Sequence, residues 1–260
     1  MKLGDYVINK LAEIGVDKMF VVYGAANGDL IDAFTRTKKT EYVAVMHEQA
    51  GGFAAESYAK IKKVPGVAIA TSGPGGMNLL TPMGNCFYDS TPVIFITGQI
   101  NSQFLRGDQS IRQVGFQECD IVSMAIPVTK YAVMITKAED IRYELEKCIY
   151  LSQEGRPGPV LIDIPLNLQK AQIEPEKLLG FDIERAKLKY DIEEVDSQID
   201  QIIEDIYKSK RPVIMAGMGV RIADAADELR ELGEILNIPV YPTWNALDVV
   251  TSDYKQYGGR

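Results

Sequence analysis

The sequence predicts an α/β protein: a parallel sheet with helices on both faces, followed by the beginning of a second α/β domain. Short apolar runs rich in Val and Ile alternate with longer segments whose apolar residues recur at helical spacing. This alternation is typical of right-handed βαβ units, and strands that are apolar throughout belong to a sheet covered on both faces. The 260 residues, 46% apolar and 25% charged, suffice for one large domain or two ordinary ones.

The first domain is expected to fill residues 1–168, starting with a helix because apolar residues at 3, 7, 8, 11 and 14 share one face. Further helices are predicted near 30–34, from His47 to about Lys63, from Gly76 to about Tyr88, near 114–122 and after residue 139. Their expected partners are buried strands at 19–23, 41–46, 66–71, 92–97, 128–135 and 159–165.

The rest of the chain predicts a linker and a partial domain. Residues 169–195 are charged and lack a clear period, which favours a linker. Residues 196–260 form a partial second domain, with strands at 212–217 and 238–242 and helices at 197–208 and 223–236. The first of these helices is expected to bury Ile199, Ile202, Ile203 and Ile206. Two strands are too few for a sheet covered on both faces, so this domain is expected to be unfinished.

Composition excludes several functions. The net charge of −8, without a basic block, disfavours binding to nucleic acid or an anionic membrane. No signal peptide or 18-residue apolar run is visible, and three widely spaced cysteines indicate reduced thiols, so a cytoplasmic protein is expected. The single histidine, His47, excludes a zinc site built on several histidines, and no metal ligands are predicted in the chain. An enzyme of this composition is expected to use a cofactor.

Four loops should meet at the carboxyl edge of the sheet, where ligands of open α/β sheets bind. They are 23–28, His47-Glu48, 72–78 and the loop that begins at Gly98-Gln99. Each has an ordinary interpretation: the glycines of 72–76 suit a tight turn as well as a ligand. Glu48 suits either a partnered carboxylate beside a buried helix or a helix-start carboxylate that the dipole favours. Their clustering is the argument for a site.

The motifs in these loops resemble those of thiamine-diphosphate enzymes of the acetolactate synthase and pyruvate oxidase family. HEQAGGFAAESYAK (47–60) is similar to the family's HEQxAxxxAxGYAR, and TSGPGGMN (71–78) is similar to TSGPGxxN. In the same order follow Gly98-Gln99, FQE (116–118), PVTK (127–130) and RPGPVLIDIP (156–165). RPVIMAGMGV (211–220) resembles the start of the family's central domain.

The resemblance implies that residues 1–168 are a pyrimidine-binding domain. Glu48 would be the catalytic acid, hydrogen-bonded to a nitrogen of the aminopyrimidine ring. The residues implied to bind the cofactor are Tyr23, Gly24, Thr71, Pro74, Asn78 and Gln99. Those implied to border the substrate are Gly28, Phe116 and Gln117.

The implied activity is that of the N-terminal part of a 2-oxo acid decarboxylase or carboligase, most like acetolactate synthase with pyruvate as substrate. Gly28 favours it because related decarboxylases tend to have a polar side chain there. Two alternatives stay open: a ligase with another acceptor such as a keto sugar, and a catalytically silent binding or regulatory fragment. The family's Gly-Asp-Gly…Asn motif is absent, so Mg²⁺ ligands are expected outside these residues and the fragment alone is expected to be inactive. FAD is left open, and a homodimer or homotetramer is implied.

Overall fold

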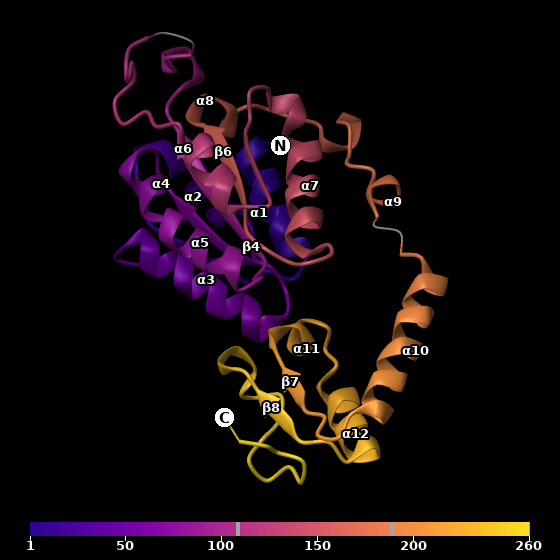
Figure 1. Ribbon diagram of the computed structural model, residues 1–260. Helices are drawn as coiled ribbons and strands as arrows, with labels where there is room; N and C mark the ends of the chain where they lie inside the picture. The colour runs from indigo at the N-terminus through magenta and orange to yellow at the C-terminus, as the bar shows by residue number, and fades with distance from the viewer. Residues whose placement is uncertain (108–109, 188–189, 260) are drawn as a thin grey trace. The chain divides into compact units, whose positions relative to one another are not determined.

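The computed structural model describes residues 1–107, 110–187 and 190–259. The chain forms two compact units, Met1–Leu188 and Lys189–Arg260. In the described part of the first unit, six parallel strands form one sheet in the order β2-β1-β3-β4-β6-β5 (Figure 1). The predicted α/β class is therefore confirmed. The strands are β1 Lys18–Val21, β2 Glu41–Ala44, β3 Gly66–Ala70, β4 Val93–Gln99, β5 Tyr131–Met134 and β6 Val160–Pro165.

Helices lie on both sides of this sheet, with α1 and α7 on one side and α3 and α5 on the other (Figure 1). In the described part of this unit the helices are α1 Leu3–Glu13, α2 Gly28–Ala33, α3 Glu48–Lys62, α4 Pro74–Asn78, α5 Leu80–Tyr88, α6 Ile121–Ala125, α7 Ile141–Gln153, α8 Leu166–Gln169 and α9 Ile183–Ala186.

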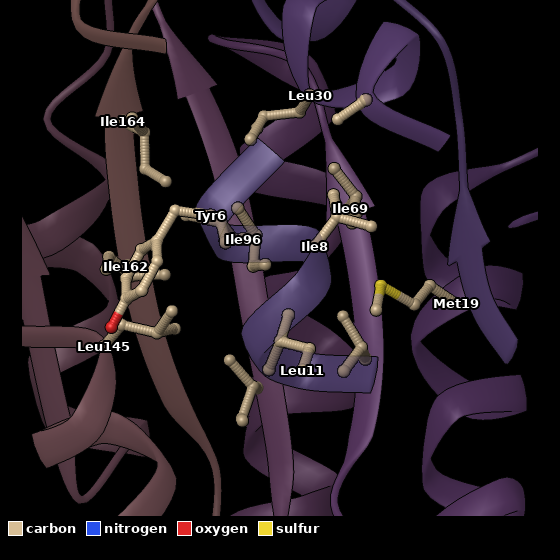
Figure 2. Close-up of a cluster of buried hydrophobic side chains, with 14 of the residues drawn as sticks. Tyr6, Ile8, Leu11, Met19, Leu30, Ile69, Ile96, Leu145, Ile162 and Ile164 are labelled. Carbon is tan, nitrogen blue, oxygen red and sulfur yellow. The ribbon is translucent and has the colours of Figure 1, made fainter. Parts of the chain in front are cut away.

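The central strands β3, β4 and β6 are largely apolar because each one contributes to two cores, whereas β2 at the edge of the sheet, which was expected to be buried, is exposed along its whole length. On β4, Ile94 and Ile96 join the core beneath α1, α2 and α7, while Val93 and Phe95 join the core beneath α3, α5 and α6. Successive side chains of a strand point to opposite faces, so a strand buried on both faces has no polar side. Figure 2 shows part of the first core, in which Ile8 of α1 lies close to Ile69 of β3.

The strand order brings the predicted loops together. All five pairings are parallel, so every strand ends at the same edge of the sheet. β1 lies between β2 and β3, and β4 follows β3. The segments that follow β2, β1, β3 and β4 are therefore neighbours at the carboxyl edge.

Three local predictions need correction. Gly98 and Gln99 were expected after the strand but are its last two residues. The helix expected near 114–122 begins only at Ile121, where Asp120 caps it by accepting a hydrogen bond from Ser123 N. The helix expected from Gly76 to Tyr88 is two helices that meet at Leu79. Pro82 accounts for the break, because it has no N–H to bond the carbonyl four residues earlier, at Asn78.

The second unit contains two parallel strands in its described residues, as predicted. Its elements are α10 Ile192–Lys208, β7 Ile214–Ala216, α11 Met218–Ile222, α12 Ala226–Leu236 and β8 Val240–Pro242. Helix α10 is confirmed, but the predicted burial of its isoleucines is wrong: Ile199, Ile202 and Ile203 are 47%, 57% and 45% exposed, and Ile206 is half-buried. Helical spacing determines which residues share a face, not what covers that face.

The segment predicted as a linker begins on the first unit. Met1 N donates to Ile173 O, Ile173 N donates to Met1 O, and Leu3 N donates to Ala171 O. Phe181 lies edge-on to Tyr143 of α7.

The three cysteines are buried and free of disulfides. No helix within the described ranges is both long enough and apolar enough to cross a membrane.

Candidate functional site

Glu48 is the first residue of α3, directly after the segment that leaves β2. His47 precedes the helix as its N-cap, and its Nδ1 accepts a hydrogen bond from Gln49 N at 3.1 Å. The start of a helix favours a carboxylate because its free N–H groups carry partial positive charge. The Glu48 carboxylate also has a side-chain partner: Asn78 Nδ2 donates to its Oε2 at 2.9 Å. This bond joins two residues that the sequence predicted for one site.

Asn78 reaches Glu48 because the loop after β3 makes an unusually tight entry into α4. Gly73 has φ +60°, a conformation that L side chains rarely adopt, and a Cβ there would lie 2.7 Å from Gln117 O. A Cβ on Gly75 would lie 2.8 Å from Thr71 Cγ2 and 3.3 Å from Glu48 Oε1. The absence of a side chain at Gly75 thus lets this turn lie close to Thr71 and to the carboxylate oxygen that Asn78 does not use.

Thr71 connects this loop to the one that follows β1. A Cβ on Gly24 would lie 2.6 Å from Thr71 Oγ1, so the backbone at Gly24 passes directly over that threonine. Ala26 N donates to Thr71 Oγ1 at 3.2 Å. The loop is held by Asn27, which is fully buried, accepts from Gly24 N at 2.8 Å and donates to Val22 O at 2.9 Å. Glycines at 24 and 75 therefore let two loops approach the same side chain.

Five predicted residues thus lie together, namely Gly24, Glu48, Thr71, Pro74 and Asn78. Beside them, Tyr23 is 72% exposed, and its ring lies 3.8 Å from where a Gly28 Cβ would be. Gln117 touches Gly73 through its backbone, and Phe116 next to it is 85% exposed. The roles inferred for these residues stay predictions.

Gln99 is placed differently, because its side chain is 2% exposed and its amide is used inside the protein. Its Nε2 donates to Asp163 Oδ2 and to Cys119 O, both at 2.9 Å, and its Oε1 accepts from Ile100 N at 3.0 Å. Both N–H groups of the amide and one of the two lone pairs of its oxygen are therefore used within the protein.

Asp163 is the residue that sequence reasoning missed. It is 1% exposed in the middle of β6, and its Oδ1 accepts from Thr97 Oγ1 at 2.7 Å. Burial raises the pKa of its carboxyl to about 7, with Asp120 adding to the rise, while the hydrogen bonds from Thr97 and Gln99 oppose it. One carboxylate in an otherwise apolar strand, VLIDIP, was the available signal, because such a group needs partners.

Known families match the two units. The N-terminal TPP binding domain of thiamine pyrophosphate enzymes matches residues 1–124, and the central domain of the same enzymes matches residues 199–260. The chain belongs to the thiamine pyrophosphate enzymes. The N-terminal match spans all ten predicted site residues, from Tyr23 to Gln117, so the cluster built around Glu48 lies in this family's cofactor-binding domain.

Several curated proteins that are similar in sequence to this thiamine pyrophosphate enzyme are acetolactate synthases. The large subunit from Corynebacterium glutamicum is 37% identical over 256 residues, which cover 97% of this chain and 39% of that subunit. The Mycobacterium bovis acetolactate synthase is 34% identical over 96% of this chain and 39% of its own length. The Arabidopsis thaliana chloroplastic enzyme is 34% identical over 93% and 35%. The chain thus spans less than half of the length of these relatives.

The second unit of this thiamine pyrophosphate enzyme has an open pocket of about 700 Å³ at the carboxyl ends of β7 and β8. Met215, Met218, Tyr241 and Trp244 line it. The FAD site that the sequence left open stays a prediction. Among the described residues, no group of three or more His, Cys, Asp and Glu side chains is placed to hold a metal ion.

Proposed function

We propose that this thiamine pyrophosphate enzyme is the N-terminal part of an acetolactate synthase, which decarboxylates pyruvate and transfers the two-carbon unit to a 2-oxo acid. The observation that carries the proposal is the Glu48–Asn78 pair, with one Glu48 oxygen bound to Asn78 and the other beside the turn at Gly75. The identity of 31–37% to acetolactate synthases over most of this chain supports the choice of activity.

The residues fit an aminopyrimidine ring. Such a ring is flat, with nitrogen atoms at its edge that exchange hydrogen bonds with a carboxyl group. Glu48 Oε1 lies beside Gly75, where the absence of a side chain lets the backbone lie close to the carboxylate. Thr71 and Gly24 form the adjoining surface, with Thr71 held by Ala26 N. When bound, thiamine diphosphate would supply a thiazolium carbon that becomes a nucleophile on losing its proton, and a cationic ring able to accept the electron pair that carbon dioxide leaves behind.

The protein's part is to orient the cofactor and to move a proton. Glu48 would bind the ring nitrogen through Oε1 and exchange a proton with it. Asn78 would keep the carboxyl in position through its bond to Oε2, since a general acid must lie within hydrogen-bonding distance of its target. Pro74 and Tyr23 would border the cofactor, and Gly28, Phe116 and Gln117 would border the substrate.

We further propose that Mg²⁺ and the diphosphate are held by residues outside these 260, and that the enzyme is a homodimer or homotetramer. The large apolar side chains exposed on three neighbouring helices support self-association: Phe53 of α3, Met77 of α4 and Tyr88 of α5 are 37%, 43% and 74% exposed. Contact with another protein chain would cover large apolar side chains of this kind.

The test of the activity uses the complete enzyme with thiamine diphosphate, Mg²⁺ and ¹³C-labelled pyruvate, with products identified by NMR. We expect acetolactate from the wild type and none from Glu48→Gln. Glu56→Gln is the matched control, because Glu56 is a buried carboxyl on the same helix that bonds Lys60 and Asn85 instead. Turnover only with a different acceptor, such as a keto sugar, would contradict the acetolactate assignment. Binding of the cofactor without turnover of any substrate would instead support the alternative of a catalytically silent binding protein.

A further inference from the structure

The loop that carries Phe116 and Gln117 is tied together around one side chain. Glu118 accepts hydrogen bonds through its carboxylate from Arg106 N at 2.6 Å and from Val114 N at 2.9 Å. Its backbone carbonyl accepts from Gln113 Nε2 at 2.8 Å. These bonds make residues 113–118 a local unit, but they do not attach it to the sheet.

Gln99 provides a buried attachment. Cys119 directly follows the loop, and its carbonyl accepts from Gln99 Nε2 at the end of β4. The same amide group donates to Asp163 Oδ2 on β6, and Asp163 Oδ1 accepts from Thr97, also on β4. Gln99 cannot turn over without placing its Oε1 against two acceptors, so Asp163 and the Cys119 carbonyl together determine which way the amide faces.

We propose that Asp163 is a positioning residue: through Gln99 it holds Cys119 and the preceding loop at the carboxyl edge of the sheet, so that the affinity for the 2-oxo acid depends on this buried carboxyl. The inference rests on the proposed function, in which Phe116 and Gln117 border the substrate. The loop also touches the other side of the site, because Gln117 O would lie 2.7 Å from a Cβ on Gly73. A displacement of the Cys119 backbone would therefore also displace the 72–78 loop beside Glu48.

Asp163 can exchange protons because its side chain lines a pocket of about 300 Å³ that opens beside the loop. The charged and titratable groups facing this pocket are Arg106, Glu118, Cys119 and Asp120. Burial raises the pKa of Asp163 to about 7, and Asp120 adds to the rise. The ionised carboxylate makes the stronger bond to Gln99, since a charge-assisted hydrogen bond exceeds a neutral one. Protonation weakens the attachment.

The decisive variants are Asp163→Asn and Gln99→Met in the complete enzyme. Asparagine can accept from Gln99 and donate to Thr97, so it mimics the protonated acid and preserves the packing. We expect it to raise the KM for pyruvate about fivefold at pH 8, the difference between a charge-assisted and a neutral bond, with kcat within about twofold. The KM of the wild type should rise as the pH falls through 7, whereas that of Asp163→Asn should stay level. Gln99→Met removes both bonds and should raise KM further, independently of pH.

Hydrogen–deuterium exchange of residues 113–119 gives a readout that needs no activity. We expect faster exchange there in Asp163→Asn and Gln99→Met, and unchanged exchange in Glu56→Gln, because the buried Glu56 carboxyl bonds Lys60 and Asn85 and not the loop. If Asp163→Asn does not fold, Gln99→Met decides. Unchanged exchange in Gln99→Met would overturn the positioning role, and faster exchange with an unchanged KM would overturn the link to substrate affinity. An enzyme without pyruvate turnover would refute the proposed function, while exchange would still decide the role of Asp163.

Discussion

Gly98→Ala should destabilise the first unit, because the loop that follows β1 lies directly against β4 at this residue. A Cβ on Gly98 would lie 2.5 Å from Ala26 C and 2.9 Å from Asn27 N, and closer still to Ala26 O. All three atoms belong to the backbone, so no side chain can rotate away. Ordinary van der Waals contact begins at 3.4 Å, and the two segments would have to separate by about 1 Å.

The neighbouring bonds resist that separation. Ala26 N is bound to Thr71 Oγ1, and Ala26 O accepts from the buried Gln169 Nε2 at 2.7 Å. Overpacking a well-packed interior costs about 1–3 kcal/mol, and because both sides are backbone we expect the upper end, about 3 kcal/mol. For a unit of this size that lowers Tm by about 6–12 °C.

Thermal and urea unfolding followed by circular dichroism measure the effect, with Gly84→Ala as the matched control. A Cβ on Gly84 would have Val128 Cγ1 at 3.9 Å as its nearest neighbour, and the residue lies inside helix α5. Alanine there should stabilise by about 0.5–1 kcal/mol. A Gly98→Ala variant as stable as the wild type, or changed in the same direction as Gly84→Ala, would refute this account of the close approach.

Three further predictions concern charge, assembly and cofactor binding. The native state holds the Asp163 proton up to about pH 7, whereas the unfolded chain releases it near 3.8, so the group's contribution to stability is complete below about pH 4 and lost by pH 7. Asp163→Asn should therefore gain stability relative to the wild type between pH 4 and 8, by at most about 4 kcal/mol in urea unfolding; parallel pH profiles would contradict this. Sedimentation should show self-association of the polypeptide, and Met77→Glu on the exposed face of α4 should weaken it; monomer at all concentrations would argue against the interface. Calorimetry should find much weaker thiamine diphosphate binding to these 260 residues than to the complete enzyme, because charge-assisted contacts to the diphosphate are the strong ones; micromolar binding with turnover would exclude that view.

Much of the fold was predictable because the central strands of the sheet are buried on both faces. Strands such as GVAIA of β3 are continuous apolar runs, and helical spacing marks the segments between them. The clustering of Glu48 and Asn78 followed from the edge at which parallel strands end. Their bond did not, because it depends on the break at Leu79 and on the tight entry at Gly73.

Other features depended on contacts far apart in the sequence. Gln99 looked like a loop residue because the apolar run ends at Thr97, yet Gly98 and Gln99 continue the ladder opposite Ile164 and Pro165. The connection between Gln99 and Asp163 spans 64 residues and has no local pattern. The isoleucines of α10 show the opposite failure: their spacing predicted the helix correctly, but spacing does not say what covers the helix.

The central claim is that Glu48 acts on the aminopyrimidine ring, and proton exchange at C2 of bound thiamine diphosphate tests it most directly. In Glu48→Gln the amide oxygen can still accept the hydrogen bond from Asn78, so the site keeps its shape while losing the acid. Exchange of the C2 proton for deuterium, followed by NMR after rapid quenching of the complete enzyme, should slow by about 100-fold or more, the usual contribution of a general acid–base group. Exchange at the wild-type rate in Glu48→Gln, with cofactor bound, would contradict the assignment.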